Sequence, residues 1–172
     1  DSKEKKYEDI VTDDAITDKG LFQVHQVDDK YYYEIPDSLF GREMLVVTRI
    51  AKTASGIGFG GGKQNTQVLR WEKRSKKVLL RVVSHQVVAA DSLPIHEAVV
   101  KSNFEPILYR FDRRTIGNDS TCTVIQVNRF LESDVKAIGF PASRRKTYKI
   151  SSLDKSRSFI ESIKSYPLNV EM

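Results

Sequence analysis

The sequence predicts an α+β fold that is mostly antiparallel β, with about seven strands in hairpin order and two or three short helices. Two observations carry this prediction. Short segments of alternating apolar and polar residues are separated by compact turn signals, as in hairpins. No strand–helix–strand alternation is visible, which argues against a parallel sheet. We therefore expect a curved or partly closed sheet with helices covering an end or an edge.

Length and composition fit one soluble domain. The chain has 172 residues, of which 40% are hydrophobic and 30% charged, as in ordinary globular proteins. Residues 1–20 are expected to form an N-terminal arm or short helix, with an apolar face at Tyr7, Ile10 and Val11. Residues 21–172 are expected to form a single β-rich domain that ends in a short helix. No apolar run approaches the roughly 18 to 20 residues of a membrane span.

The first predicted hairpin joins residues 22–27 to residues 31–35. A two-residue turn at Asp28-Asp29 would place Val24 opposite Tyr33 and give the hairpin one apolar face. We expect His25 on its outer face, beside Tyr32.

Residues 44–51 form the next predicted strand. This segment is apolar on both faces apart from Thr48 and Arg49, which predicts that the strand is buried. It leads into residues 55–65, a loop that contains five glycines.

The clearest hairpin pairs residues 66–74 with residues 77–85. Its register sets Arg70 opposite Arg81, an arrangement that is repulsive by itself. Glu72, a diagonal neighbour of Arg81, or a carboxylate from elsewhere could relieve this repulsion. The other predicted pairs are Trp71 with Leu80, Leu69 with Val82, and Lys73 with Val78.

The following segments predict a helix, another hairpin and a loop. Asp91-Ser92 and Pro94 indicate a helix start, and the buried stripe of this helix would be Ile95, Ala98 and Val99. Residues 104–112 and 120–130 indicate a hairpin that turns near Gly117-Asn118. A basic loop is expected to begin at Gly139.

The last predicted helix runs from Asp154 to Ser165. It would bury Phe159, Ile160 and Ile163, and Pro167 would prevent its continuation. The chain stops at Met172, five residues after Pro167. A packed helix so close to the end leads us to expect a domain cut from a longer polypeptide.

The glycine-rich loop leaves three interpretations open. Gly56, Gly58 and Gly61 formally match the dinucleotide motif GxGxxG, and Gly62-Lys63 hints at a phosphate-binding loop. Both motifs require a helix after the glycines, whereas a strand is predicted here. The loop could instead be a mobile connection, or it could order against a partner domain.

Metal and nucleophile signals are weak. The pair His96-Glu97 resembles the start of HExxH, but Val100 stands where the second histidine belongs. The other histidines, His25 and His85, are scattered. The single cysteine, Cys122, excludes an intrachain disulfide and has strand spacing typical of a core thiol. We predict no catalytic, metal or cofactor-binding residue in this chain.

The charge is moderately basic. The 28 basic residues outnumber the 23 acidic ones and give a net charge of +5. The densest basic runs, Lys73-Arg74 with Lys76-Lys77 and Arg144-Arg145-Lys146, can be solvated turns or an anion-binding patch. Nucleic acid is not favoured as a partner, because the aromatic run Tyr31-Tyr32-Tyr33 would point to alternating faces of a strand and make no continuous stacking platform.

Four blocks of sequence, read together, resemble a known protein family. They are residues 33–50, residues 67–72 with 79–84, residues 102–107, and residues 152–170. Together they resemble the N-terminal domain of unknown function in large zinc-dependent metalloproteases of Gram-negative bacteria, over roughly residues 7–172. The resemblance implies export to the periplasm or cell envelope. It also implies that zinc binds only to an HExxH helix in a downstream catalytic domain.

Two functions follow as hypotheses. In the first, this chain is a non-catalytic accessory domain that packs on the downstream metalloprotease domain of the same polypeptide, or guides substrate to it. The expected contact residues are Gly58, Phe59, Gly60, Gly61, Lys63 and Arg157. In the alternative, the chain is a stand-alone binding module for an anionic polymer, such as an anionic glycan. The basic runs and the net charge support this alternative.

Overall fold

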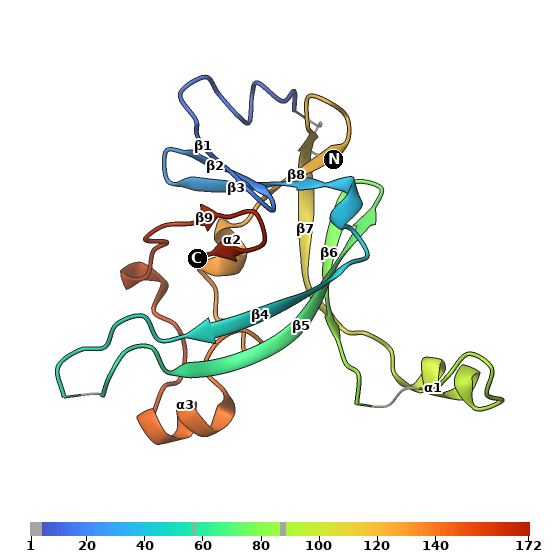
Figure 1. The fold of residues 1–172 in the computed structure, drawn as a ribbon. Helices are drawn as coiled ribbons and strands as arrows, with labels where there is room; N and C mark the ends of the chain where they lie inside the picture. The colour runs from blue at the N-terminus through green and yellow to red at the C-terminus, as the bar shows by residue number, and fades with distance from the viewer. Residues whose placement is uncertain (1–4, 57, 87–88) are drawn as a thin grey trace.

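A computed structural model describes residues 5–56, 58–86 and 89–172 and confirms the predicted fold class. The chain forms one eight-stranded antiparallel sheet, in the order β1-β2-β3-β8-β7-β6-β5-β4, and a separate hairpin of two short strands. The large sheet is strongly curved, and the C-terminal hairpin lies on its concave side (Figure 1). The strands of the large sheet are β1 (Ile16–Lys19), β2 (Gln23–Val27), β3 (Lys30–Pro36), β4 (Glu43–Arg49), β5 (Lys63–Arg74), β6 (Lys77–Val83), β7 (Ile107–Ile116) and β8 (Cys122–Gln126).

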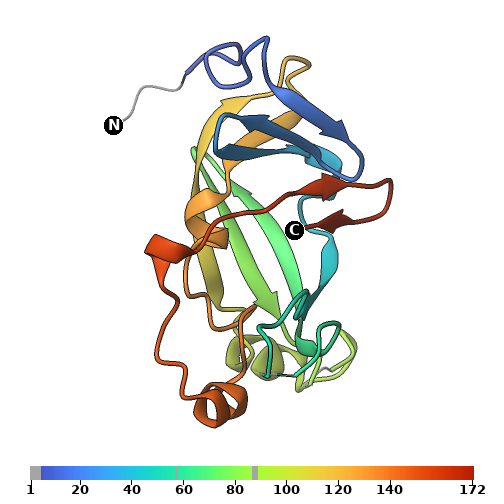
Figure 2. The same cartoon turned by 90° about the vertical axis from the view of Figure 1, so that its left-hand side faces the viewer.

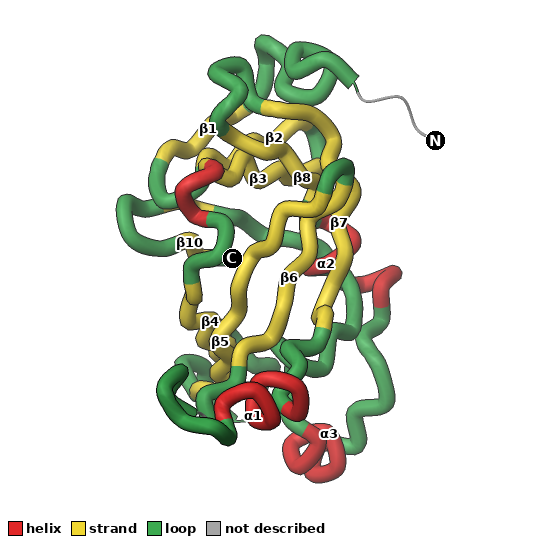
Figure 3. Tube along the Cα trace, turned by 90° about the vertical axis from the view of Figure 1, so that its right-hand side faces the viewer, coloured by secondary structure: helices red, strands yellow, loops and turns green. Residues whose placement is uncertain are grey.

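The remaining elements are short. The hairpin consists of β9 (Lys164–Ser165) and β10 (Val170–Glu171). The described residues contain three α-helices, α1 (His96–Ser102), α2 (Asn128–Leu131) and α3 (Ala142–Tyr148), and two 3-10 turns, Asp37–Leu39 and Lys155–Arg157. None of the helices in this part of the chain has the length and apolarity needed to span a membrane. Figure 3 shows β5, β6 and β7 side by side, with α1 and α3 at the end far from β1 and β2.

The hairpin predictions are confirmed in register. Val24 pairs with Tyr33 across a two-residue turn, and Arg70 pairs with Arg81. The predicted pairs Trp71–Leu80, Leu69–Val82 and Lys73–Val78 are also present. Because side chains alternate between faces of a strand, this register sends Val24, Tyr33, Leu69, Trp71 and Leu80 into one core.

The core fills the concave side of the sheet. Its centre is a group of aromatic rings at short centroid distances, which includes Trp71–Phe111 at 5.5 Å and Tyr109–Phe130 at 5.1 Å. Phe22 joins this group through Trp71 and Tyr33. Edge-to-face and tilted ring pairs of this kind stabilise a core beyond their buried area.

The opposite face of β2, β3 and β8 is also covered. Ile10 is buried there against Tyr32 and Val124, and Tyr7 and Val11 pack around it. The apolar face predicted for this N-terminal segment is therefore present. The segment is made of turns rather than a helix, and it continues into β1, which pairs with β2.

The prediction that residues 44–51 form a buried strand is wrong in its burial. β4 lies at an edge of the sheet and pairs only with β5. Met44 and Val46 turn toward the core, whereas Leu45 is 68% exposed and Val47 is also exposed. A strand that is apolar on both faces normally has both faces covered, so the exposed face of β4 is an exception within the described chain.

One helix prediction and one loop prediction also need correction. α1 forms within the predicted segment, but none of its residues is buried, and Ile95 before it is exposed. The expected basic loop after Gly139 is instead helical at α3, whose Arg145 is held by Asp134. Local helix propensity does not predict whether α1 packs on the core, and it did not indicate that α3 forms.

The predicted helix from Asp154 to Ser165 is wrong. Only Lys155–Arg157 forms a helical turn, capped by the Asp154 side chain. The chain then extends along the open side of the sheet to β9 (Figure 2). Ile163 is buried and Ile160 packs on the core, as predicted, but Phe159 is 82% exposed.

β9 docks tightly on the first strands of the chain. Ser165 donates two hydrogen bonds here: its Oγ donates to the Phe22 carbonyl at 2.7 Å, and its backbone N–H donates to the Asp18 carboxylate at 3.0 Å. A Cβ at Gly20 would lie 2.6 Å from the Tyr166 carbonyl oxygen, so only glycine permits this approach. These contacts tie the end of the chain to its beginning.

The two phenylalanines Phe159 and Phe130 give a direct test of this correction. We expect Phe159→Ala to change the free energy of unfolding by less than about 0.5 kcal/mol, because an exposed side chain loses little on truncation. Phe130→Ala should destabilise the domain by about 3 to 5 kcal/mol, because Phe130 is buried among Tyr109 and Phe111. Urea denaturation measures both changes in the free energy of unfolding. Equal destabilisation by the two substitutions would show that Phe159 belongs to the core.

Candidate functional site

A cavity of about 420 Å³ opens between the sheet and the C-terminal hairpin. Its size lies within the range of about 300–1,000 Å³ that is typical of ligand pockets. The floor consists of core side chains, among them Phe22, Tyr33 and Trp71. One wall is β4, and the other is the segment from Leu168 to Met172.

The mouth of the cavity is apolar and exposed. Leu168 is 88% exposed, and Leu45 and Met172 are also exposed. Met172 reaches inward, where its sulfur accepts a hydrogen bond from the Tyr33 hydroxyl at 3.7 Å. Burial raises the pKa of the Tyr33 phenol, which therefore stays a donor at neutral pH. The polar side chains at the lining, Arg42, Glu43 and Asn169, are few.

Both walls of the cavity end in open strand edges. β4 pairs only with β5, and β10 pairs only with β9, within the part of the chain that the structure describes. Backbone groups on the outer side of each strand therefore have no strand partner there. Folded proteins usually protect such edges with charges, bulges or covering segments, yet the middle of β4 carries Leu45, Val46 and Val47.

The predicted contact residues of the glycine loop lie beyond the end of β4. Phe59 is 94% exposed, and Lys63 is the first residue of β5. Gly61 donates its N–H to the Ile50 carbonyl at 2.6 Å. Gly60 lies so near Ala51 that a Cβ would approach its carbonyl oxygen to 2.4 Å, and Gly58 has positive φ.

Arg157, the last predicted contact residue, pairs with Asp154 in the 3-10 turn. Lys52, which lies between β4 and the glycine loop, forms an exposed ion pair with Glu161 of the C-terminal segment at 3.2 Å. The sequence did not indicate this pair, since its members are distant in the chain. Whether these residues contact a partner stays a prediction.

The dinucleotide and phosphate-loop interpretations lack the helix they need. β5 follows the glycines directly, so within the described chain no helix begins where the loop ends. Ile57, within the glycine motif, lies outside the described residues. The loop connects two antiparallel neighbours, β4 and β5, as the interpretation of a simple connection requires.

His25 belongs to a buried polar network rather than to an exposed face. The predicted neighbour, Tyr32, is confirmed, but the N-terminal segment covers this face and leaves His25 1% exposed. Its Nε2 lies 2.8 Å from the Glu34 carboxylate, and its Nδ1 lies 2.8 Å from the Thr17 hydroxyl. Tyr7 donates a further hydrogen bond to the same Glu34 oxygen, also at 2.8 Å.

Glu34 also belongs to a small group of potential metal ligands. In the described chain, ligand atoms of Glu34, Asp119 and Cys122 lie within 4.8 Å of one another. Burial raises the pKa of the Cys122 thiol, so it is protonated and unreactive at neutral pH. Glu34 is held by Tyr7 and His25. The position of Glu34 in this group is therefore explained by its hydrogen bonds in the polar network.

The three histidines do not converge on a zinc site. His25 pairs with Glu34, His85 pairs with Glu43, and His96 contacts the Ala89 carbonyl and Asp91. Tetrahedral zinc sites need several such ligands around one point. These residues therefore do not fit a zinc ion.

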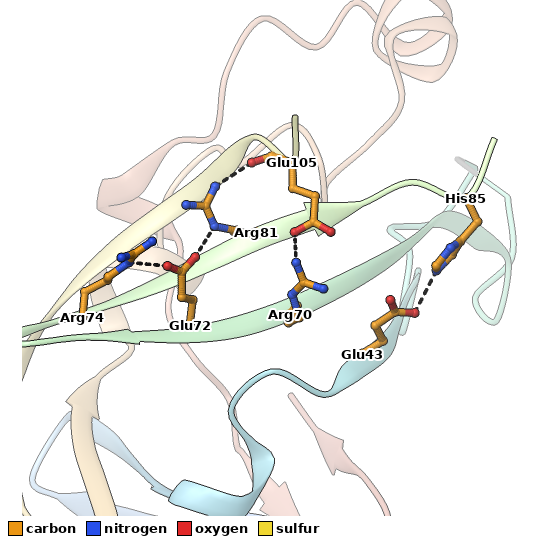
Figure 4. Close-up of polar contacts among 7 residues, drawn as sticks. All are labelled: Glu43, Arg70, Glu72, Arg74, Arg81, His85 and Glu105. Atoms are coloured by element: carbon orange, nitrogen blue, oxygen red, sulfur yellow. Dashed lines mark hydrogen bonds and ion pairs between the residues drawn. The ribbon is translucent and has the colours of Figure 1, made fainter. Parts of the chain in front are cut away.

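A charge network covers the convex face of β5 and β6 (Figure 4). Arg81 pairs with Glu72 and donates to the Glu105 carbonyl at 2.7 Å, and Arg70 pairs with the Glu105 carboxylate. The predicted diagonal contact of Glu72 with Arg81 is confirmed, and Glu105 is the carboxylate from elsewhere. The hydrogen bond from Arg81 lowers the pKa of Glu72 and keeps it charged. The network neutralises two facing arginines and presents no open reactive group.

Comparison with known proteins gives two family matches and no individual relative. Residues 61–172 match the family described as domain of unknown function DUF5117, and residues 4–53 match the domain of unknown function DUF5118. No curated protein and no solved structure shows a significant match. The boundary between the two matches falls in the glycine-rich loop.

The two matched segments build one sheet. β1 to β3 come from the first segment and join β8 of the second, while β4, also from the first, joins β5 at the other edge. The second segment supplies the four middle strands and the hairpin that closes on Gly20 and Phe22. Two thirds of the chain match a single family, and the chain accordingly belongs to the DUF5117 family, with a DUF5118 segment interleaved in the same fold.

Proposed function

We propose that this chain is the N-terminal accessory domain of a secreted zinc-dependent metalloprotease, and that a strand of the downstream catalytic part docks in the opening between β4 and β10. The observation that carries this proposal is the apolar cavity flanked by two open strand edges. The accessory domain contributes no catalytic residue of its own. Zinc would be held by the downstream domain, and the whole polypeptide would act in the periplasm or cell envelope.

The opening favours an extended peptide over other occupants. Unpaired backbone N–H and C=O groups along β4 are satisfied best by another strand, as in β-strand addition. Side chains of such a strand alternate, so every second one would point into the cavity over Trp71. The apolar mouth at Leu45 and Leu168 requires these side chains to be apolar.

The link to a metalloprotease is supported by the sequence resemblance of residues 33–50, residues 67–72 with 79–84, residues 102–107 and residues 152–170. Three of these blocks contribute to the opening: the first contains β4, the second contains Leu69 and Trp71, and the last contains the lining residues Leu168 to Val170. The resembling residues and the open site therefore coincide in space.

The anionic-polymer alternative has less support. In the first basic run, Lys73 pairs with Asp37 and Arg74 with Glu72. In the second, Arg145 is held by Asp134. Basic side chains that are already neutralised release few counterions, which makes a steep salt-dependent attraction to a polyanion weaker.

Hydrogen exchange tests the docking proposal. The coding sequence after Met172 is first checked for an in-frame HExxH segment, and the complete polypeptide is then compared with residues 1–172 alone. We expect the β4 amides to exchange at least about tenfold more slowly in the complete polypeptide, because a docked strand would protect its outer edge. Amides of β6, in the middle of the sheet, serve as the internal reference.

A lysine on the edge should undo this protection. Leu45→Lys places a charge at the mouth of the cavity, whereas Leu93→Lys places the same charge on the exposed segment before α1 and serves as the matched control. Unchanged exchange of β4 in the complete polypeptide would contradict the docking surface. The lack of any downstream HExxH segment would contradict the metalloprotease assignment itself.

A further inference from the structure

A second, polar cleft lies beside β7 and α2. It has a volume of about 210 Å³. Its charged and polar lining is Arg110, Asp112, Arg114, Gln126 and Arg129, and Tyr109 and Phe111 complete it. Three arginines from two elements thus face one small space.

These arginines differ from several others in the described chain because they form no ion pair. Within residues 5–56, 58–86 and 89–172, none of Arg110, Arg114 and Arg129 forms an ion pair, whereas Arg70, Arg81 and Arg145 each bind a carboxylate. Like charges in one cleft repel one another. An arrangement of this kind is stabilised when an anion occupies the space between them.

Arg114 is fixed in place and still has a free donor. Its Nη2 donates to the Gln126 side chain at 3.2 Å, which holds the guanidinium plane. Its Nε is buried and has no hydrogen-bond partner among the residues that the structure describes. Buried donors in proteins are nearly always satisfied, so an acceptor is missing at this point.

The acidic residue of the cleft does not supply that acceptor. Asp112 bonds to Lys77 on the neighbouring strand, and this hydrogen bond lowers the pKa of the Asp112 carboxyl. The charges of Arg110 and Arg114 also lower this pKa, but one carboxylate cannot balance Lys77 and three arginines, so an excess positive charge remains in the cleft.

We propose that this cleft binds a phosphate-type oxyanion, free or as the head of a small phosphomonoester or phospholipid. Guanidinium groups match the geometry of phosphate oxygens and bind them by charge-assisted, often paired hydrogen bonds. A cleft of about 210 Å³ is large enough for one such group but small for a polymer. This site lies apart from the proposed docking opening and does not depend on it.

Arginine side-chain signals in ¹H–¹⁵N spectra provide the test, with inorganic phosphate as the probe at constant ionic strength. We expect a saturable shift of the Arg114 Nε–H signal with a dissociation constant on the order of 1 mM or lower, because three guanidinium groups surround the anion. Arg114→Gln and Arg129→Gln should each weaken binding at least about tenfold. Arg42→Gln, at an exposed arginine of the other cavity, is the matched control and should leave binding unchanged.

Two further probes identify the source of the phosphate. Glycerol phosphate should compete with inorganic phosphate if the natural ligand is a free phosphomonoester, and vesicles containing phosphatidylglycerol should compete if it is a lipid head group. Arg129→Gln keeps the outcome interpretable if Arg114→Gln unfolds, because Arg129 is exposed on α2. A linear, unsaturated shift with phosphate, or equal binding by Arg129→Gln and Arg42→Gln, would overturn the proposal.

Discussion

A fragment of residues 61–172, which is the DUF5117 match alone, is expected to lose cooperative folding completely. The removal of residues 1–60 eliminates β1 to β3 at one side of the sheet and β4 at the other. It also strips Phe22, Val24, Tyr33 and Ile35 from the core. The four strands that remain would have both edges open and their apolar face uncovered, which is unfavourable for independent folding. Near-ultraviolet circular dichroism and urea denaturation would show no cooperative transition.

Cutting the chain without removing anything is the matched control. A protease site inserted between Gly58 and Phe59 interrupts the exposed loop that joins β4 to β5. After cleavage we expect the two pieces to stay together through gel filtration, because β3–β8 and β4–β5 pairing hold them at two separate places. Exposed loop tips tolerate such interruptions. If residues 61–172 instead fold alone and give a dispersed spectrum, the two families are separate domains and the interleaved sheet is wrong.

The sequence predicted the local hairpins because their information is local. Alternation of apolar residues and a two-residue turn fix the register of Val24 with Tyr33, and the same holds for Trp71 with Leu80. The order of hairpins in the sheet depends on the pairing of β3 with β8, whose residues are about 90 positions apart in the chain. No periodicity in either strand encodes that contact.

The errors share one physical cause, which is that burial is decided by distant segments. The residues around Phe159 have helical spacing, yet extending the chain lets Ile163 and Ser165 dock on β1 and β2. Tertiary contacts of this kind override weak helix propensity. The sequence of β4 predicts a fully buried strand because both its faces are apolar, whereas one face of β4 is exposed in the structure. Such a departure from the usual pattern is expected at functional surfaces, and the proposed docking site lies there.

None of the predicted contact residues, in the glycine loop and at Arg157, lines the cavity, and their contact with a partner stays a prediction. The cavity beside β4 needs the C-terminal hairpin as its second wall, which composition and position in the chain do not indicate. The arginine cleft was missed, because Arg129 is brought to Arg110 and Arg114 only by the turn from β8 into α2. The one available signal was the spacing of Arg110 and Arg114 on a single strand.

Breaking the buried His25–Glu34 pair is expected to be as damaging as truncating a core phenylalanine. His25→Ala would leave the Glu34 carboxylate buried with Tyr7 as its remaining donor among the described residues. An uncompensated buried charge of this kind costs about 3 to 5 kcal/mol in free energy of unfolding. Urea denaturation at neutral pH measures the loss.

The chain contains its own control for this prediction, because His85 makes the same 2.8 Å contact with Glu43 in solvent. The side chains of that pair are 57% and 41% exposed, against 2% and 4% for His25 and Glu34. We expect His85→Ala to cost at most about 1 kcal/mol, since water solvates the carboxylate that remains. Replacing both His25 and Glu34 by leucine should cost less than the sum of the single substitutions, because no charge is then left buried. Equal losses for His25→Ala and His85→Ala would mean that the covering N-terminal segment opens readily, and that Glu34 reaches water when its partner is gone.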